Sequence, residues 1–122
     1  MNSQCFTIPG RLSGYNELHT ANWRVSHRRK TDAMNAVLFY ARMARIKPCA
    51  RPVAVAIRCF EPNARRDRDN VASGACKVIL DALQRCGVLA GDGQRYVTAV
   101  SCAVEVDRER PRVEVELEEV DA

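Results

Sequence analysis

Residues 65–92 have the sequence RRDRDNVASGACKVILDALQRCGVLAGD, and this stretch decides the fold. Apolar residues recur within it at helical spacing as far as Gly87, and glycine commonly follows the last turn of a helix. We therefore predict a helix over residues 70–85. Gly74 inside it would cost about 1 kcal/mol relative to alanine, which indicates either tight packing or an irregular first turn. The predicted buried stripe consists of Val71, Ala75, Val78, Ile79, Ala82 and Leu83.

Three aspartates flank this predicted helix. Asp67 and Asp69 lie just before it, and Asp92 lies in the loop beyond it. Alternate residues of an extended segment point to the same side, so the carboxylates of Asp67 and Asp69 should converge. Like charges held together require a cation between them, and oxygen ligands suit Mg²⁺ or Mn²⁺. Asn70, beside the cluster, could cap the helix or bind a metal-bound water.

Arginines surround the three aspartates, and this arrangement is expected where a bound metal ion contacts a polyanion. The pattern therefore predicts a metal-dependent phosphodiesterase that acts on nucleic acid. The metal ion would lower the pKa of a bound water and neutralise charge on the phosphate. Lys77 on the helix would orient that water or stabilise the phosphate in the transition state.

The same residues have structural alternatives. Asp67 could pair with a neighbouring arginine, Asp69 could cap the helix, and Asp92 could be a turn residue. Lys77 and Asp81 are four residues apart and could form a surface ion pair worth a few tenths of a kcal/mol. Asp81 itself is interpreted as a residue that supports the site without contacting substrate. These alternatives do not explain why three acids coincide with so much arginine.

Length and composition predict one globular domain over residues 1–122, because 47% of the 122 residues are hydrophobic and 28% are charged. No run approaches the roughly 20 apolar residues of a membrane span. We expect no secretion signal, because residues 1–10, MNSQCFTIPG, have neither a basic region nor an apolar run. We expect a cytoplasmic protein that has no contact with membranes and no small-molecule cofactor.

The six cysteines are scattered, with no C-x₂-C pair and no histidine ligands nearby, so neither a zinc site nor a disulfide framework is predicted. Four of them lie in apolar patterns and are expected to be small core residues: Cys59, Cys76, Cys86 and Cys102.

Charge is divided unevenly along the chain. Residues 1–68 carry 13 Lys and Arg against four acids, a net charge of +9, whereas residues 69–122 carry a net charge of −5. Beside three aspartates, the basic half favours nucleic-acid binding. The predicted phosphate contacts are Arg28, Arg29, Lys30, Arg65, Arg66 and Arg68.

The rest of the chain alternates short elements. We expect strands at 5–8 and 53–60, a helix over 26–46 capped by Ser26, and an ordered loop over 11–23. The last two strands, 95–106 and 112–117, should form a hairpin. The order β-α-β-α-β-β predicts an α+β fold with a small mixed or antiparallel sheet and two helices on one face.

Two aromatic residues, Tyr15 and Trp23, fall in the predicted loop. Each could stack on an unpaired base, an interaction worth about 1–3 kcal/mol. Packing against the protein is the more common role of tryptophan, and we expect it for Trp23. His19 and His27 are expected at the surface.

Several pieces of the chain, taken in order, resemble the RusA family of Holliday junction resolvases. The opening FTIPGRLSGYN at residues 6–16 is similar to that family's first strand and asparagine-bearing loop. The resemblance covers most of the chain, and its specific part is the central third. That part consists of DRDN at 67–70, Lys77, ILDAL at 79–83, GVL at 87–89 and DGQ at 92–94.

The resemblance implies a RusA-like fold and cleavage of four-way DNA junctions by a homodimer with Mg²⁺ or Mn²⁺. It assigns the catalytic and metal-binding acids to Asp67, Asp69 and Asp92, and the catalytic lysine to Lys77. This chain has about four more residues before that lysine than the family often has, which turns the lysine by only about 40° on a helix. It also has a single acid, Asp92, where the family often has a pair.

Two other functions are compatible with the sequence. One is a less selective metal nuclease that cuts flaps or branched DNA, and the other is a non-catalytic module that binds DNA junctions or single strands. A two-fold dimer would favour the resolvase, because symmetric cuts require two active sites related by symmetry. The strands that follow Asp92 are the expected dimer edges.

Overall fold

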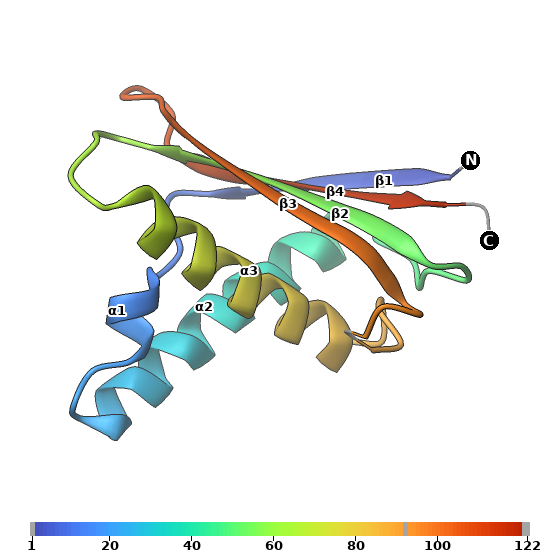
Figure 1. Ribbon diagram of the computed structural model, residues 1–122, viewed down its shortest axis with the longest axis horizontal. Helices are drawn as coiled ribbons and strands as arrows, with labels where there is room; N and C mark the ends of the chain where they lie inside the picture. The colour runs from blue at the N-terminus through green and yellow to red at the C-terminus, as the bar shows by residue number, and fades with distance from the viewer. Residues whose placement is uncertain (1, 92, 121–122) are drawn as a thin grey trace.

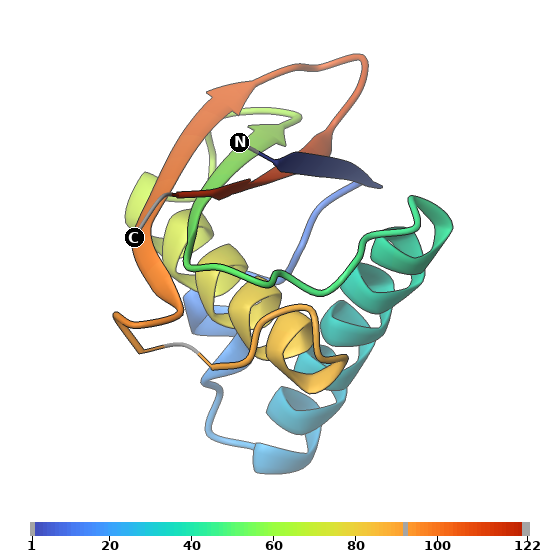
Figure 2. The ribbon, with the colours of Figure 1, turned by 90° about the vertical axis from the view of Figure 1, so that its right-hand side faces the viewer.

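The computed structural model describes residues 2–91 and 93–120. In this part of the chain a four-stranded sheet is covered on one face by the helices (Figures 1 and 2). The predicted α+β class, with a mixed sheet and two long helices on one face, is confirmed. The elements are β1 (Ser3–Pro9), α1 (Tyr15–Leu18), α2 (Trp23–Met43), β2 (Val53–Glu61), α3 (Arg68–Arg85), β3 (Val97–Val106) and β4 (Arg112–Glu119).

The sheet has the strand order β1-β4-β2-β3. β2 and β3 are parallel and joined through α3, whereas β4 is antiparallel to both of its neighbours, β1 and β2. The predicted hairpin of the last two strands is therefore wrong, because β2 lies between them. The connection after β3 passes the end of β2, where the Asp107 amide donates to the Glu61 carbonyl at 2.8 Å. β2 takes this central place because its nearly continuous apolar sequence suits a strand that is paired on both edges.

Both long helices begin earlier than predicted. α2 starts at Trp23, and its N-cap is Asn22, whose Oδ1 accepts from the Arg24 amide at 3.0 Å. Ser26, the predicted cap, lies inside the helix and instead hydrogen-bonds to Thr20 through its hydroxyl at 2.7 Å. α3 starts at Arg68 rather than at residue 70. The predicted loop over residues 11–23 contains the short helix α1.

The core lies between the sheet and the two long helices. All six predicted stripe residues of α3 are buried, which confirms the helical pattern. Gly74 is buried as well, and a Cβ there would run into the backbone of Ser13 and Gly14. The glycine therefore permits a close approach between α3 and the segment before α1, so tight packing is the correct alternative. Of the four cysteines predicted in the core, Cys59 is buried, but Cys86 is exposed because it is the C-cap of α3.

All six cysteines are free thiols. Among the described residues, no helix has the length and hydrophobicity needed to cross a membrane.

The two faces of the molecule differ in charge. The sheet face away from the helices carries Glu114, Glu116 and Glu118, which alternate along β4 with buried apolar residues. On the opposite side, the first half of α2 carries the run Arg28-Arg29-Lys30. The charge asymmetry of the sequence thus becomes an acidic sheet face and a basic helical face.

Candidate functional site

An open pocket of about 610 Å³ lies at the N-terminal end of α3. Asp67 and Asp69 both line it, so the structure brings together two of the three predicted acids. Asp92, the third, lies outside the described residues. The other lining residues are Tyr15, Asn16, Arg68, Asn70 and Ser73.

The backbone conformation that places the two aspartates at this pocket differs from the prediction. Asp67 is the N-cap of α3, with an extended backbone at φ −63° and ψ 142°, but Asp69 already belongs to the first helical turn. The expectation that both lie on one extended segment is therefore wrong. Their side chains face the same pocket because the N-cap and the first turn together surround the end of the helix.

Neither carboxylate is used structurally. The Asp67 side chain makes no capping hydrogen bond, so the capping role open to an aspartate before a helix is not used. Both side chains are exposed, and neither has an ion-pair or hydrogen-bond partner within residues 2–91 and 93–120. At the helix N-terminus their negative charges are favoured by the helix dipole. Two unpaired carboxylates are thus held beside one pocket.

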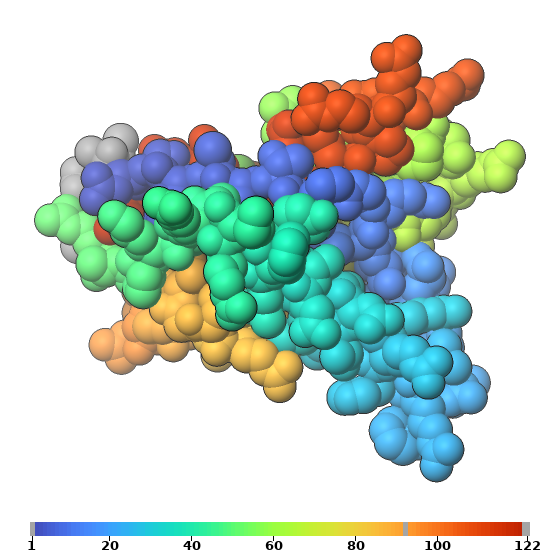
Figure 3. Space-filling model, turned by 180° about the vertical axis from the view of Figure 1, so that it is seen from behind, coloured from blue at the N-terminus to red at the C-terminus, as the bar shows by residue number. Residues whose placement is uncertain are grey.

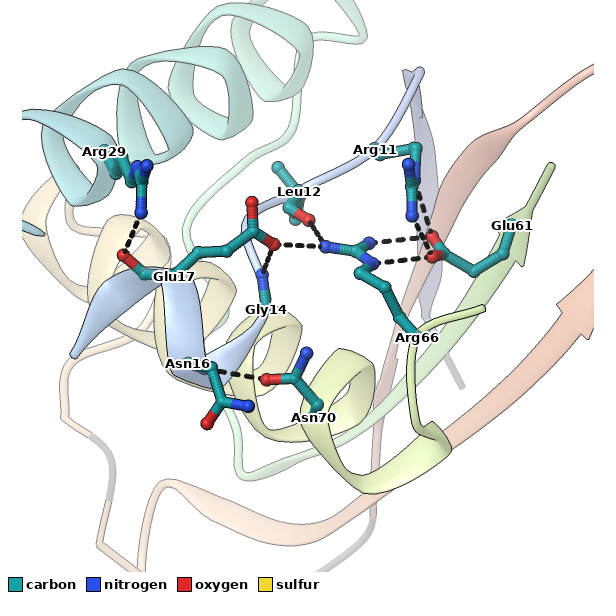
Figure 4. A network of polar contacts seen from close by, with 9 residues as sticks. All are labelled: Arg11, Leu12, Gly14, Asn16, Glu17, Arg29, Glu61, Arg66 and Asn70. Carbon is teal, nitrogen blue, oxygen red and sulfur yellow. Dashed lines mark hydrogen bonds and ion pairs between the residues drawn. The ribbon is translucent and has the colours of Figure 1, made fainter. Parts of the chain in front are cut away.

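Arg66, which precedes Asp67, forms its hydrogen bonds with residues other than the two aspartates (Figure 4). Arg66 donates from Nε to Oε1 of Glu61 at 2.8 Å and from Nη2 to Oε2 at 2.9 Å. Its Nη1 donates to Oε1 of Glu17 at 2.7 Å and to the Leu12 carbonyl at 3.0 Å. Arg11 adds a bond from Nη2 to Glu61 at 2.8 Å. Arg66 therefore joins the end of β2, α1 and the segment after β1 immediately before Asp67.

Within this network Glu61 is only 4% exposed, whereas Arg11 and Glu17 are partly accessible to solvent. Burial by itself would raise the pKa of Glu61, but the hydrogen bonds from Arg66 and Arg11 outweigh it, and the pKa lies below its ordinary value. The same balance, with the Gly14 amide as a further donor, lowers the pKa of Glu17. Sequence reasoning assigned Arg66 to phosphate binding, whereas the structure places its guanidinium among carboxylates.

Asn70 holds α1 against α3. Its Oδ1 accepts from the Asn16 amide at 2.7 Å, and its side chain packs so closely on Gly14 that a Cβ there would meet Nδ2 at 2.6 Å. The Asn70 oxygen is thus engaged by the neighbouring backbone, and through it the Asn16 side of the pocket is positioned.

Lys77 lies away from the two carboxylates. It follows Asp69 by eight residues on α3, about 12 Å along the helix axis at 1.5 Å per residue. Its Nζ lies 3.2 Å from Oδ2 of Asp81, and Lys30 reaches the same oxygen at 3.0 Å. Burial would raise the pKa of Asp81, but the hydrogen bonds from Lys30 and Lys77 lower it overall. The structure thus forms the ion pair between Lys77 and Asp81 that the sequence left as an alternative.

The remaining predicted phosphate contacts are spread over the helical side. Arg68 is exposed and lines the pocket with the aspartates. Arg65 is exposed, and its backbone amide donates to Asn63. On α2, Arg28 is exposed, while Arg29 donates to the Glu17 carbonyl at 3.2 Å.

The two carboxylates fit a hard cation. Mg²⁺ usually keeps several waters and is bound by one or two carboxylates together with substrate phosphates. Asp67 and Asp69 supply such a pair, and their oxygens carry no competing cation in the described structure. A cluster of three or more His, Cys, Asp or Glu ligands is absent from residues 2–91 and 93–120.

Sequence reasoning missed several residues of this region. Asn16 and Ser73 line the pocket, and Glu17, Glu61 and Arg11 build the network around Arg66. A single exposed serine or asparagine carries no pattern. Of the two glutamates, only Glu61 could have been suspected from the sequence, because it ends an apolar strand.

Comparison with known protein families finds no match, and no curated protein is similar to the chain. Among solved structures, the periplasmic domain of Helicobacter pylori MotB (residues 90–256) is similar over 96% of this chain and 74% of that chain. The identity is 16% and the TM-score is 0.48. At this distance the similarity assigns neither a fold family nor a function.

Proposed function

We propose that this protein is a Mg²⁺- or Mn²⁺-dependent endodeoxyribonuclease that cuts branched DNA, with the four-way Holliday junction as its substrate. The observation that carries the proposal is the pair of exposed, unpaired carboxylates of Asp67 and Asp69 in one pocket with Arg68. Two exposed carboxylates without a protein counter-charge are free to bind a hard cation, which Mg²⁺-binding sites complete with waters and substrate phosphates. The resemblance of the sequence to RusA-type resolvases supports the same activity.

Asp67 and Asp69 would hold the metal ion. When bound, the ion supplies a water of lowered pKa and neutralises charge on the scissile phosphate. Arg68 lies at the same pocket and would pair with a phosphate oxygen, for which a guanidinium is well suited. The Ser73 hydroxyl can donate to the same group. The Arg66 network would act indirectly, because it fixes the residue before Asp67.

Lys77 would contact the bound DNA at a position away from the metal ion. About 12 Å of helix axis separates it from Asp69 along α3, and its ammonium group is paired with Asp81. A neighbouring phosphate of the same strand is within that range, and we propose that Lys77 neutralises it. Asp81 would hold Lys77 and Lys30 in place.

The distribution of charge favours DNA binding on one side of the molecule. On β4, Glu114 is paired with Arg112 and Arg58, but Glu116 and Glu118 disfavour a phosphate backbone, whereas the helical side offers Arg28, Arg65 and Arg68. We propose that DNA lies along the helices, over the pocket.

A homodimer would give the two symmetric cuts that resolve a junction. β3 is an edge strand of ten residues, of which Glu105 alone is charged. An unprotected edge of this kind is suited to pairing with another strand. We propose that two copies pair antiparallel through β3.

The test is cleavage of a labelled four-way junction and of a linear duplex of the same sequence, with Mg²⁺, Mn²⁺ or EDTA. Asp69→Asn removes one carboxylate at the pocket, and Asp32→Asn, an exposed acid on α2, is the matched control. Paired nicks near the crossover that require metal, persist in Asp32→Asn and vanish in Asp69→Asn are the expected result.

Two outcomes would point to the other functions. Equal cutting of flaps, junctions and duplex would indicate a general nuclease. Tight junction binding with no cutting in any metal would overturn the enzymatic proposal and leave a DNA-binding module.

A further inference from the structure

Trp23 is exposed to an unusual degree for tryptophan. It is the first residue of α2, and 70% of its surface is accessible, the largest exposed fraction of any large hydrophobic side chain in the described chain. The expectation that it packs against the protein is therefore wrong. Burying an apolar ring is favourable, and tryptophan is enriched at binding interfaces, so the exposed ring of Trp23 is available to a partner.

The backbone that presents Trp23 is held firmly. Asn22 caps α2 by accepting from the Arg24 amide at 3.0 Å, and the preceding turn is tied by Thr20, whose amide donates to the Ser26 hydroxyl at 2.9 Å. The His27 ring lies one turn along the helix with its centre 6.4 Å from that of Trp23. The indole is therefore presented from a fixed helix start rather than from a loose loop.

The surroundings of Trp23 are basic. The segment 23–31 has the sequence WRVSHRRKT, with four Lys or Arg and no acid. Arg24 and Arg28 are exposed, and within the part of the chain that the structure describes neither forms an ion pair. A cationic surface around an exposed aromatic ring is complementary to a strand with a negative backbone and accessible bases.

This surface continues toward the carboxylate pocket. Tyr15, which lines the pocket, is stacked on His19 with ring centres 4.1 Å apart, and His19 lies just before the turn that leads to Trp23. In Figure 3 the blue segment that runs from α1 into α2 projects from the body of the molecule. The aromatic residues thus follow the segment that connects the pocket with the projecting helix start.

We propose that Trp23 stacks on an unpaired base of a nucleic-acid strand whose backbone is held by Arg24 and Arg28. The inference rests on the proposed function only in taking nucleic acid as the ligand. It deepens that function by defining the substrate as one with unpaired bases, at a branch point or in a single strand. A fully paired duplex has no free base face to offer.

Trp23 is the only tryptophan of the chain, so its fluorescence reports on this position alone. The full-length protein is titrated in EDTA with a single-stranded oligonucleotide, with the matching duplex, and with a junction that has unpaired bases at its centre. Stacking should quench the emission strongly with the single strand and the junction, and only weakly with the duplex. Because EDTA prevents metal-dependent cutting, the result is independent of nuclease activity.

Variants are compared by the anisotropy of labelled DNA. Trp23→Ala should weaken binding to the single strand and the junction about tenfold or more, in line with the loss of one base–aromatic stack. Trp23→Phe should retain most of the affinity. Phe39→Ala removes another exposed aromatic of α2, 56% accessible, and should leave affinity unchanged. Since Trp23 is exposed, its variants should keep the wild-type Tm.

The proposal is overturned if Trp23→Ala binds single strands as tightly as the wild type, or if duplex quenches the emission as strongly as single strand. A blue shift with vesicles of anionic lipid, without any response to DNA, would also overturn it and assign the surface to membranes. Stacking without junction cleavage would keep this inference and reject the nuclease. Cleavage that Trp23→Ala leaves unchanged, with unchanged affinity, would do the reverse.

Discussion

The Arg66 guanidinium donates to both carboxylate oxygens of Glu61, at 2.8 and 2.9 Å, and so joins the last residue of β2 to the residue before the N-cap of α3. Parallel hydrogen bonds of this kind fix orientation as well as distance. Glu17 and the Leu12 carbonyl accept from the third nitrogen of the same side chain (Figure 4). The position of Asp67 is therefore set from the sheet, from α1 and from the segment after β1.

Replacing the buried acid of this network should destabilise the fold. Glu61→Gln leaves the guanidinium of Arg66, which is only 17% exposed, without its main counter-charge, and we expect the free energy of unfolding to fall by about 3 kcal/mol. Urea unfolding at pH 7 measures it. Glu105→Gln is the control, because its pair with Arg58 is exposed on both sides and should contribute less than about 1 kcal/mol. A loss in Glu61→Gln of less than about 1 kcal/mol, no larger than that expected of the control, would show that the network is not structurally important.

The same carboxylate predicts sensitivity to acid. The pKa of Glu61 in the folded state lies below its ordinary value of 4.5, so its contribution to stability is complete above about pH 4.5 and is lost as the pH falls through the folded pKa. Unfolding curves of wild type and Glu61→Gln between pH 7 and pH 3 should show a constant difference at high pH that narrows below pH 4.5. A difference that widened in acid would contradict this assignment.

Local sequence patterns predicted the helices and strands. The strand order and the side-chain partners depend on long-range contacts, which local patterns do not specify. The stripe from Val71 to Leu83 specified α3 because a helix face repeats within the sequence. The order of the strands depends on which neighbours β2 accepts, and an apolar strand is compatible with several pairings, so the hairpin prediction failed. Asp67 and Asp69 were found because two acids near a helix start form a pattern. The hydrogen bonds of Arg66 were not predicted because two of its acceptors, Glu17 and the Leu12 carbonyl, lie 49 and 54 residues away in the sequence. The exposure of Trp23 was not predicted either, because it depends on where α2 begins relative to the rest of the fold.

Gly74 offers a case in which an ordinary helix-stabilising change should fail. Glycine to alanine inside a helix usually gains up to about 1 kcal/mol. Here the added Cβ would meet the backbone of Ser13 and Gly14, so we expect Gly74→Ala to lose about 1–3 kcal/mol and to displace the α1 side of the pocket. Thermal unfolding tests the first effect. Gln84→Ala, an exposed change on the same helix, should stay within about 0.5 kcal/mol of the wild type.

Kinetic measurements on a Lys77 variant distinguish a catalytic role of this residue from an electrostatic one. If it neutralises a phosphate away from the metal, Lys77→Gln should raise KM severalfold and reduce the salt dependence of DNA binding by about one contact, with kcat nearly unchanged. Arg45→Gln, an exposed cation beyond the end of α2, is the control. A fall in kcat of a hundredfold or more at unchanged KM would instead assign Lys77 to the reacting phosphate.

Metal binding at the pocket can be detected without any cleavage. A cation bound only by the folded protein at ten times its Kd adds about 1.4 kcal/mol to the free energy of unfolding, which corresponds to a rise of a few degrees in Tm. Mn²⁺ should produce this rise in the wild type and in Asp32→Asn, and the rise should be lost in Asp67→Asn and Asp69→Asn. Sodium chloride at the same ionic strength controls for screening. A rise that survived in both pocket variants would place the cation elsewhere, with the acidic row of β4 as the first alternative, and would remove the chemical basis for assigning Asp67 and Asp69 to catalysis.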